Sequence, residues 1–513
     1  MEFTLIDKGE SRVCAIEQPG TVLDALGELG ISIPAACGGR GTCGKCRVLV
    51  RDETGSRYRL ACQVPLVEGM EVVVAESGSM EVSMDGIETP WHADGSEEGL
   101  GIAIDVGTTT VVCRLYDLES GKCLAAAGRA NPQATFGADV ISRITACSRG
   151  LRTTMCNLLS ASLGDMVDDV LARAGADAAR IARVVLVGNT VMESIAGDVD
   201  PEPIGVVPFI PLTLFGEEVE LGCLAERGIT GGKAWFAPCI AGYVGGDVTG
   251  DLLAIDIRHR DKLVIVLDLG TNGEMALGDS QAVVACATAA GPVFEGANIT
   301  HGMPAYPGAI SRVQLEGDDV AFTTIDGKPP VGVCGTGLID AVAVLLRAGV
   351  VDETGYMLDA DEALDEGVSP ALAARIFDYR GANAFRLAGD IAITQKDVRS
   401  LQLAKSAVCG GVRTMLDHRG VTTAEVSELL IAGGFGEYLN RENAARVGLF
   451  PSELVDRTRS IGNAAIEGAG AALLSGAARE EAQAIADGCE YLELSTNALF
   501  NDYYVDSMTF PEE

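Results

Sequence analysis

The sequence is poor in positive charge, in aromatic residues and in histidine. Its 38 lysines and arginines stand against 73 aspartates and glutamates, for a formal net charge of −35, and it has 4 histidines. Proteins that bind nucleic acid need basic surface to replace counterions, so this balance excludes a nucleic-acid partner. It also disfavours an anionic membrane surface and favours a protein partner that carries a basic patch.

Long apolar runs are missing as well. No window approaches the about 18 strongly apolar residues that a membrane-spanning helix needs, and Met1–Leu5 does not begin a signal peptide. The 15 cysteines are an odd number in a long chain, unlike the short, even frameworks of secreted disulfide proteins. We therefore expect a cytoplasmic protein without membrane contact, whose thiols stay free or bind metal.

Glycine is abundant, with 63 residues among 513, and 48% of the chain is hydrophobic. This composition is typical of α/β proteins with many tight turns. Shifts in composition predict four regions: a small domain over 1–76, a linker over 77–99 rich in Ser, Gly and acidic residues, a large domain over 100–478, and a tail over 479–513. In all, the pattern predicts a multidomain α+β protein.

Short strands and one helix are expected in the small domain. Glu2–Ile6 and Arg12–Ile16 predict a hairpin, and a capping-box pattern at Thr21 opens a helix to about Leu29. After a loop rich in Gly and Cys, we expect strands at Cys46–Val50 and Glu71–Ala75.

The large domain runs through one pattern twice, in lobes of about 100–261 and 262–478. Each pass opens with an apolar strand that ends in Asp, Gly101–Asp105 or Leu263–Asp268, followed by a Gly-rich turn and two returning strands. Later segments pair too: Val184–Val187 with Leu429–Ala432, and Gly242–Gly250 with Glu467–Leu474. The repetition predicts two similar α/β lobes that face each other across a cleft.

Four cysteines of the small domain are candidate metal ligands: Cys37, Cys43 and Cys46 in a C-x5-C-x2-C run, then Cys62. Four thiolates can hold two irons bridged by two sulfides, and the glycines between them let backbone N–H groups approach the sulfurs. The alternative is a structural zinc site, which usually takes two CxxC knuckles. The spacing favours a 2Fe–2S cluster and resembles plant- and vertebrate-type ferredoxins, which implies a β-grasp fold.

The turn after each Asp-ending strand is a candidate phosphate-binding loop. A carboxylate there can hold hydrated magnesium, while turn N–H groups and hydroxyls face phosphate. We expect Asp105, Asp268 and Glu274 to be catalytic. The nucleotide-binding candidates are Gly107, Thr108, Thr109 and Thr110 in the first loop, Gly270, Thr271, Asn272 and Gly273 in the second, and Gly433, Gly434, Phe435 and Gly436 beside the adenosine.

Together these segments resemble the actin, sugar-kinase and Hsp70 superfamily, whose lobes have a ribonuclease H-like fold. The resemblance implies Mg-ATP bound between lobes that open and close. The chain has no Walker A motif, so a P-loop enzyme is not expected.

Three further motifs resemble a narrower family, the reductive activators of corrinoid proteins: Asn131–Gln133 with Phe136–Arg143, Ala287–Pro292 with Phe294–Ala297, and Thr394–Arg399 with Gln402–Lys405. The chain departs from that family in its short linker and in Glu193–Ser194, where a His pair is expected after Met192. The resemblance implies ATP-dependent transfer of single electrons from the cluster to the inactive Co(II) form of a corrinoid methyltransferase protein, which restores Co(I).

The same resemblance implies roles and partners. Asp105 and Asp268 would position Mg-ATP and water, with Glu274 as the next candidate for orienting water, and an external low-potential reductant would reload the cluster. A homodimer is left open. Rival hypotheses are an ATP-driven electron donor to a dehydratase, a small-molecule kinase with a regulatory cluster, and a binding module or chaperone without electron transfer.

Overall fold

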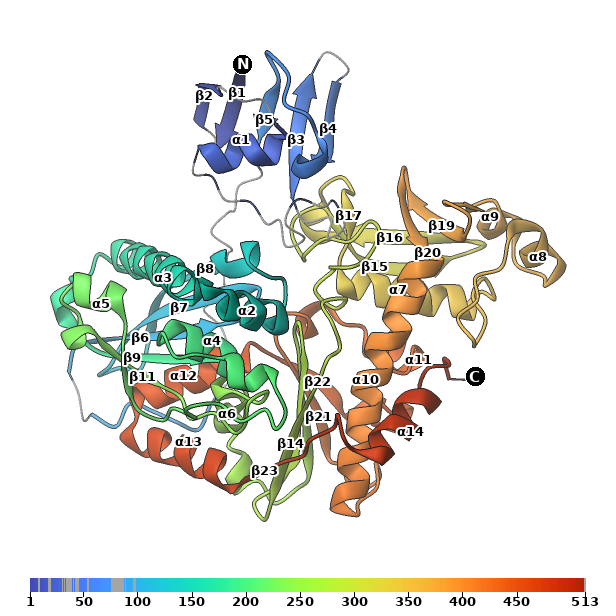
Figure 1. Cartoon of the computed structure of the whole chain (residues 1–513). Coiled ribbons are helices and arrows are strands. Elements are labelled where there is room, and N and C mark those ends of the chain that lie inside the picture. The colour runs from blue at the N-terminus through green and yellow to red at the C-terminus, as the bar shows by residue number, and fades with distance from the viewer. Residues whose placement is uncertain are drawn as a thin grey trace. The chain divides into compact units, whose positions relative to one another are not determined.

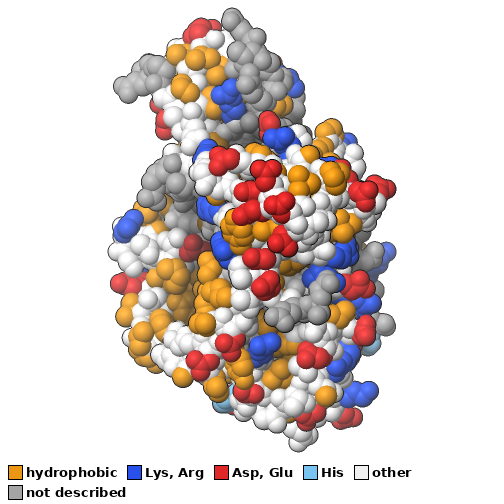
Figure 2. All heavy atoms as spheres, turned by 90° about the vertical axis from the view of Figure 1, so that its right-hand side faces the viewer, with side chains coloured by type: hydrophobic (Ala, Val, Ile, Leu, Met, Phe, Trp, Pro, Cys, Tyr) orange, Lys and Arg blue, Asp and Glu red, His pale blue; other side chains and the backbone are white. Residues whose placement is uncertain are grey.

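The structure is a computed structural model (Figure 1). It describes residues 1–511 except 8–9, 17–19, 30, 32, 34–38, 40, 42–45, 53–54, 75–86, 88 and 96–97. By their contacts the residues form two compact units, Met1–Ala254 with Ala465–Ala486, and Ile255–Ala464 with Asp487–Glu513. None of the helices in the described part is long and apolar enough to cross a membrane. Acidic side chains are spread over the face drawn in Figure 2.

The small N-terminal domain is a five-stranded sheet with one helix. Its strand order is β2-β1-β5-β3-β4, with β1 and β5 parallel. The predicted capping box at Thr21 opens the helix, whose buried Val22, Ala25 and Leu26 join the core of the sheet. The elements are β1 Glu2–Asp7, β2 Glu10–Ala15, α1 Val22–Glu28, β3 Arg47–Asp52, β4 Gly55–Leu60 and β5 Glu71–Val73. The ferredoxin-type fold is confirmed, and β4 is a strand that the sequence analysis did not predict.

The rest of the first unit, which we call the first lobe, is built on a six-stranded sheet of order β10-β11-β9-β6-β7-β8. Every residue of β6 is buried, and α3 packs on β7 and β8. The strands are β6 Leu100–Val106, β7 Thr110–Asp117, β8 Cys123–Ala130, β9 Ile181–Gly188, β10 Glu218–Glu220 and β11 Lys233–Phe236. The helices are α2 Val140–Ala146, α3 Arg152–Ala174, α4 Thr190–Ala196, α5 Gly222–Glu226, α6 Gly246–Ala254, α12 Ala464–Leu474 and α13 Gly476–Gly488.

The second unit is built on a sheet of order β22-β21-β12-β13-β14-β23. Its strands are β12 Val264–Leu269, β13 Gly273–Gly278, β14 Val283–Thr288, β21 Glu428–Ala432, β22 Thr458–Gly462 and β23 Cys489–Tyr491. Two three-stranded sheets accompany it: β15 Ala309–Glu316, β16 Asp319–Thr324 and β17 Gly332–Val333, then β18 Ile376–Asp378, β19 Asn383–Ala388 and β20 Ile391–Thr394. The helices are α7 Gly335–Arg347, α8 Ala360–Asp365, α9 Pro370–Ala373, α10 Gln395–Arg419, α11 Arg441–Arg446 and α14 Ala498–Asp506.

The two large sheets repeat one topology. In the first lobe β11, β9 and β6 are parallel, and β7 and β8 follow antiparallel. In the second unit β22, β21 and β12 are parallel, and β13 and β14 follow antiparallel. The predicted duplication of α/β lobes is therefore confirmed.

The C-terminal part of the chain is divided between the units in a way that the predicted boundaries missed. Helices α12 and α13 group with the first unit, although the sequence analysis placed 464–478 in the second lobe and 479–513 in a tail. The helices α6 and α12 approach closely at Gly250 and Gly468, where there is no room for a larger side chain. A Cβ on Gly468 would lie 2.1 Å from the Gly250 carbonyl oxygen. The tail then returns to the second unit, where β23 pairs with β14 and α14 packs on α10.

The predicted linker is fixed to the first lobe at its C-terminal end. The indole N–H of Trp91 donates to the Leu253 carbonyl at 3.1 Å. Asp94 donates through its backbone N–H to Leu474, and its carboxylate accepts from the Gly476 N–H at 2.8 Å. The described residues of 87–99 form no helix or strand, as expected for a linker.

Candidate functional site

Two of the four predicted cluster ligands lie in the described part of the chain. Cys46 directly precedes β3, and Cys62 lies in a short 3₁₀ turn after β4. The antiparallel pair Arg47 and Leu60 brings them together, so that their buried sulfurs are 3.2 Å apart. Two sulfurs this close could serve as two of the ligands of one cluster. Cys37 and Cys43 lie outside the described residues.

Two glycines that lie between Cys37 and Cys43 in the sequence are close to Cys62 and its neighbour Gln63. Gly39 and Gly41 have φ angles of +82° and +74°, a conformation that favours glycine. A Cβ on Gly39 would lie 3.9 Å from the Cβ of Cys62, and one on Gly41 would overlap the amide of Gln63. Gly39 and Gly41 therefore lie close to Cys62 and Gln63. In the described part alone, no group of three or more His, Cys, Asp or Glu residues could hold a metal ion.

The first predicted phosphate loop is the turn between β6 and β7. Asp105 is buried near the end of β6, opposite Val112 of β7. Gly107 is required by the tightness of the turn, since a Cβ there would lie 2.6 Å from the Thr110 carbonyl oxygen. The predicted residues 105–110 therefore form one compact hairpin end.

Buried polar side chains hold this turn from the protein side. Asn131 donates from its amide to the Gly107 carbonyl at 2.8 Å and from its backbone N–H to the Thr109 carbonyl. Arg143, which is fully buried, donates to the Thr108 carbonyl at 2.5 Å. All three carbonyls of the turn therefore already accept hydrogen bonds, which hold the loop in one conformation.

The Thr108 hydroxyl has its own partner. It accepts from the amide of Asn189, which also caps α4 through the Met192 N–H. The sequence analysis quoted Asn131 and Arg143 only as part of a family motif and assigned no role to Asn189. Their supporting role depends on long-range contacts that no local pattern shows.

The second predicted loop lies between β12 and β13 and brings two carboxylates together. Asp268 and Glu274 are directly opposed across the strand pair, and Glu274 is buried. The Thr271 hydroxyl donates to Glu295 at 2.9 Å, a contact between two of the quoted motifs. Glu295 is thus a further candidate residue that sequence reasoning did not assign.

The predicted adenosine segment lies next to this loop, because β21 pairs with β12 and places Ala432 opposite Asp268. Gly433 has a φ angle of +83°, and a Cβ there would lie 2.8 Å from the Asp268 carboxylate. Gly434 has open space around it, and the ring of Phe435 packs on that of Phe294 with centroids 5.1 Å apart. The second unit therefore gathers Asp268, Glu274 and the glycines at one end of its sheet.

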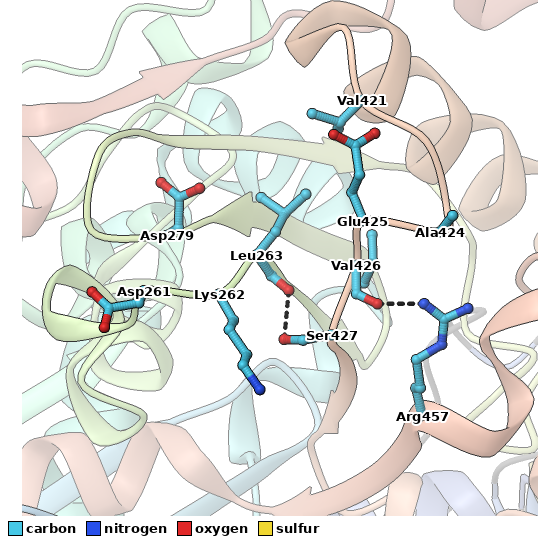
Figure 3. A pocket seen from close by; sticks show the side chains of 10 residues that line it. All are labelled: Asp261, Lys262, Leu263, Asp279, Val421, Ala424, Glu425, Val426, Ser427 and Arg457. Atoms are coloured by element: carbon cyan, nitrogen blue, oxygen red, sulfur yellow. Dashed lines mark hydrogen bonds between the residues drawn. The ribbon is translucent and has the colours of Figure 1, made fainter.

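A surface cavity of the second unit lies away from these loops. It has a volume of about 660 Å³ and is lined at its centre by Leu263, Ser427 and Arg457 (Figure 3). Leu263 and Ser427 directly precede β12 and β21, so the cavity lies at the opposite end of these strands from the predicted loops. The Ser427 hydroxyl donates to the Leu263 carbonyl, and Arg457 donates to the Val426 carbonyl, so these polar groups serve the fold.

Comparison with known families agrees with this arrangement. A 2Fe-2S iron-sulfur cluster binding domain matches residues 5–67. A model of the RACo middle region matches residues 100–260, and one of the C-terminal domain of RACo, the ASKHA domain, matches residues 262–513. The chain therefore has a ferredoxin-type domain that supports a 2Fe–2S cluster, joined to an ASKHA domain.

Relatives match over nearly the whole length. The corrinoid activation enzyme RamQ of Eubacterium limosum is 31% identical over 96% of this chain and 97% of its own. The [Co(II) methylated amine-specific corrinoid protein] reductase of Methanosarcina barkeri is 23% identical over 80% of this chain and 77% of its own. The solved structure of a reductive activator for corrinoid, iron-sulfur protein is 30% identical, with a TM-score of 0.71 over 100% of this chain and 99% of that one. The chain belongs to the RACo family of corrinoid reductive activators.

Proposed function

We propose that this protein is an ATP-dependent reductive activator, which transfers single electrons from a 2Fe–2S cluster to the Co(II) form of a corrinoid protein of a methyltransferase system. The observation that carries the proposal is the full-length match to corrinoid activators in a chain that joins a ferredoxin-type domain to a duplicated ASKHA fold. We place it in the cytoplasm, with an external low-potential reductant. None of the thirteen cysteines among the described residues forms a disulfide.

The cluster would be held by Cys37, Cys43, Cys46 and Cys62 and would supply one electron at a time. A plant-type cluster has a potential near about −400 mV, and Co(I) is harder to make than that, so the transfer runs uphill. The protein part of the work would be to keep these four thiolates together. The pairing of β3 with β4, which brings Cys46 beside Cys62, supports this role.

ATP can assist only if the chain binds its partner differently in the nucleotide-bound and nucleotide-free states. We assign Asp105 and Asp268 to the positioning of Mg-ATP and water, and Thr108, Thr109 and Thr271 to phosphate. Glu274 is the second candidate for orienting water. The buried donors Asn131 and Arg143 support these roles, because they fix the first loop before the nucleotide arrives.

Two rival functions receive less support. A kinase needs a carboxylate base for its substrate, whereas the turn after β9 presents Asn189 and Thr190, whose side chains are bonded to Thr108 and to the Ala241 carbonyl. A dehydratase activator carries its cluster at a subunit interface, whereas this chain has a ferredoxin-type domain of its own.

The test is anaerobic. The reduced protein is mixed with a Co(II) corrinoid protein, and the Co(I) absorption is followed with and without Mg-ATP. We expect Co(I) to appear faster or further with Mg-ATP, and we expect Asp105→Asn to remove the ATP effect while the cluster spectrum stays unchanged. Reduction that is indifferent to ATP, with a bound corrinoid partner, would refute the proposal.

A further inference from the structure

A loop of the first lobe exposes an unusual amount of apolar surface. The segment 206–214 follows a 3₁₀ turn at Glu202–Gly205 and leads to β10. Single exposed apolar side chains are common on proteins, but contiguous ones mark interaction sites. Five large apolar side chains of this segment, here called the apolar loop, are exposed: Val206 by 61%, Val207 by 70%, Ile210 by 64%, Leu212 by 65% and Leu214 by 43%.

The apolar loop is held in place by contacts of Phe209 and Leu214 and of the two residues that follow the loop. The rings of Phe209 and Phe215 pack on Tyr243 and Phe236, with centroids 5.6 and 5.4 Å apart. The Leu214 carbonyl accepts from the Cys239 N–H at 2.7 Å, and the Gly216 N–H donates to the Phe236 carbonyl. The exposed side chains therefore belong to an ordered surface, which saves most of the entropy that a flexible loop would lose on binding.

Negative charge surrounds the apolar loop in the sequence. The chain has no Lys or Arg between Arg183 and Arg227, and the nearest charged residues on either side of the loop, Glu202 and Glu217, are both exposed acids. A second copy of this chain, itself at −35, would bring like charges together. A partner with an apolar depression and a basic rim fits better, because opposite potentials speed association and select partners.

The loop also touches the elements that support the first phosphate loop. A Cβ on Gly242 would lie 2.3 Å from the Phe209 carbonyl oxygen, so the two segments are in close contact. The neighbouring Ala241 carbonyl accepts from the Thr190 hydroxyl at 2.6 Å, and Asn189 donates to Thr108. Contacts thus run without a break from the exposed loop to the predicted nucleotide loop, inside one lobe.

We propose that the apolar loop is the docking surface for the corrinoid protein, which meets it with an apolar patch rimmed by Lys and Arg. The proposal rests on the function proposed above and adds the place where the partner binds. Binding there buries Ile210 and Leu212 as the central contacts and brings the partner's basic side chains toward the exposed acids that flank the loop in the sequence. It also joins partner binding to the segment that contacts Asn189, so the nucleotide state can alter affinity through these contacts.

The experiment compares three full-length proteins under anaerobic conditions. They are the wild type, the variant Ile210→Ser/Leu212→Ser, and a matched control, Leu364→Ser/Leu403→Ser, which alters two exposed leucines of the second unit. The partner is the Co(II) corrinoid protein that the wild type reduces. Its Kd is measured by interferometry with Mg-ATP present, along with ATP hydrolysis without partner and electron delivery to a small dye.

We expect the loop variant to raise the Kd about tenfold or more, in the range of central interface residues, and to leave partner-free ATP hydrolysis and dye reduction unchanged. The control should bind as the wild type does. Glu202→Lys/Glu217→Lys should slow association, most strongly at low salt. All these variants change exposed side chains, so they should fold.

Other outcomes are distinguishable. A wild type that activates the corrinoid protein together with a loop variant of unchanged Kd would overturn the docking surface and leave the proposed function standing. A wild type that neither binds nor reduces the partner would overturn both. A loop variant that turns a wild-type dimer into a monomer, with partner affinity unchanged, would assign the loop to a second copy of the chain.

Discussion

Loss of one partner from the buried ion pair Arg114–Glu467 should destabilise the first unit strongly. Arg114 lies on β7 and Glu467 on α12, and their side chains are 4% and 13% exposed with N and O 2.5 Å apart. Breaking a buried pair leaves an uncompensated charge, which typically costs about 3–5 kcal/mol. Glu467→Gln and Arg114→Met should each lower the free energy of unfolding by about that amount.

The double variant Arg114→Met/Glu467→Leu should recover much of the loss, because apolar residues of similar volume leave no buried charge. The pH dependence of the free energy of unfolding provides a second test. Burial is the main cause that raises the pKa of Glu467 above its ordinary value, although Arg114 pulls it down. The Glu467 carboxyl therefore binds its proton more tightly in the folded state than in the unfolded state. As the pH rises from the unfolded pKa of this carboxyl toward its higher folded pKa, the free energy of unfolding falls. Glu467→Gln should lack this contribution.

Tryptophan fluorescence in urea is the assay, because it reports on the first unit alone. The chain has 2 tryptophans, Trp91 and Trp235, and both belong to that unit. A double-mutant cycle then gives the coupling energy of the pair. Two results would refute the reasoning. One is that the single variants have the same urea midpoint as the wild type. The other is that the double variant loses as much free energy of unfolding as the two single variants together.

Two further predictions concern the second unit. Gly433→Ala should weaken ATP binding at least severalfold without loss of the cluster spectrum. Alanine is strained at a φ of +83°, and its Cβ would lie 2.8 Å from the Asp268 carboxylate. Calorimetric titration measures the ATP affinity, and an unchanged affinity would contradict the assigned adenosine segment. Lys405 donates to the Ser507 and Thr509 carbonyls, and burial lowers the pKa of its ammonium to about 8. Its folded pKa is below its unfolded one, so protection of α14 against amide exchange, corrected for intrinsic rates, should rise by up to about 2 kcal/mol between about pH 8 and 9.5. Lys405→Met should lose this rise, and an equal rise in both proteins would refute the assignment.

Local patterns predicted the centre of each sheet well. An apolar run that ends in Asp and a Gly turn has few alternatives to a buried strand and hairpin, so β6 and β12 lie where Gly101–Asp105 and Leu263–Asp268 predicted them. Strand β4 was missed because Gly55–Leu60 is mostly polar and its pairing with β3 is decided by tertiary contacts.

Long-range features were beyond local reasoning. The return of α12 and α13 to the first unit depends on the contact between Gly250 and Gly468, which are far apart in sequence. Similarly, Arg143 is visible as part of a motif, but only the fold shows its side chain behind the phosphate loop. The apolar loop at 206–214 is rich in large apolar residues, and only the structure shows that five of their side chains are exposed.

The anchored end of the linker suggests a division of labour between the domains. Val74 directly follows β5, and Trp91 is bound to the first lobe. About 17 peptide units separate these two residues, so the chain between them can span at most about 60 Å. This covalent connection keeps the ferredoxin-type domain within that distance of any partner held on that lobe. The small domain therefore needs little affinity of its own for the corrinoid protein. Selectivity has to come from the surface that holds the partner, and an ordered apolar loop with acidic flanks on the lobe that carries the first phosphate loop meets that requirement.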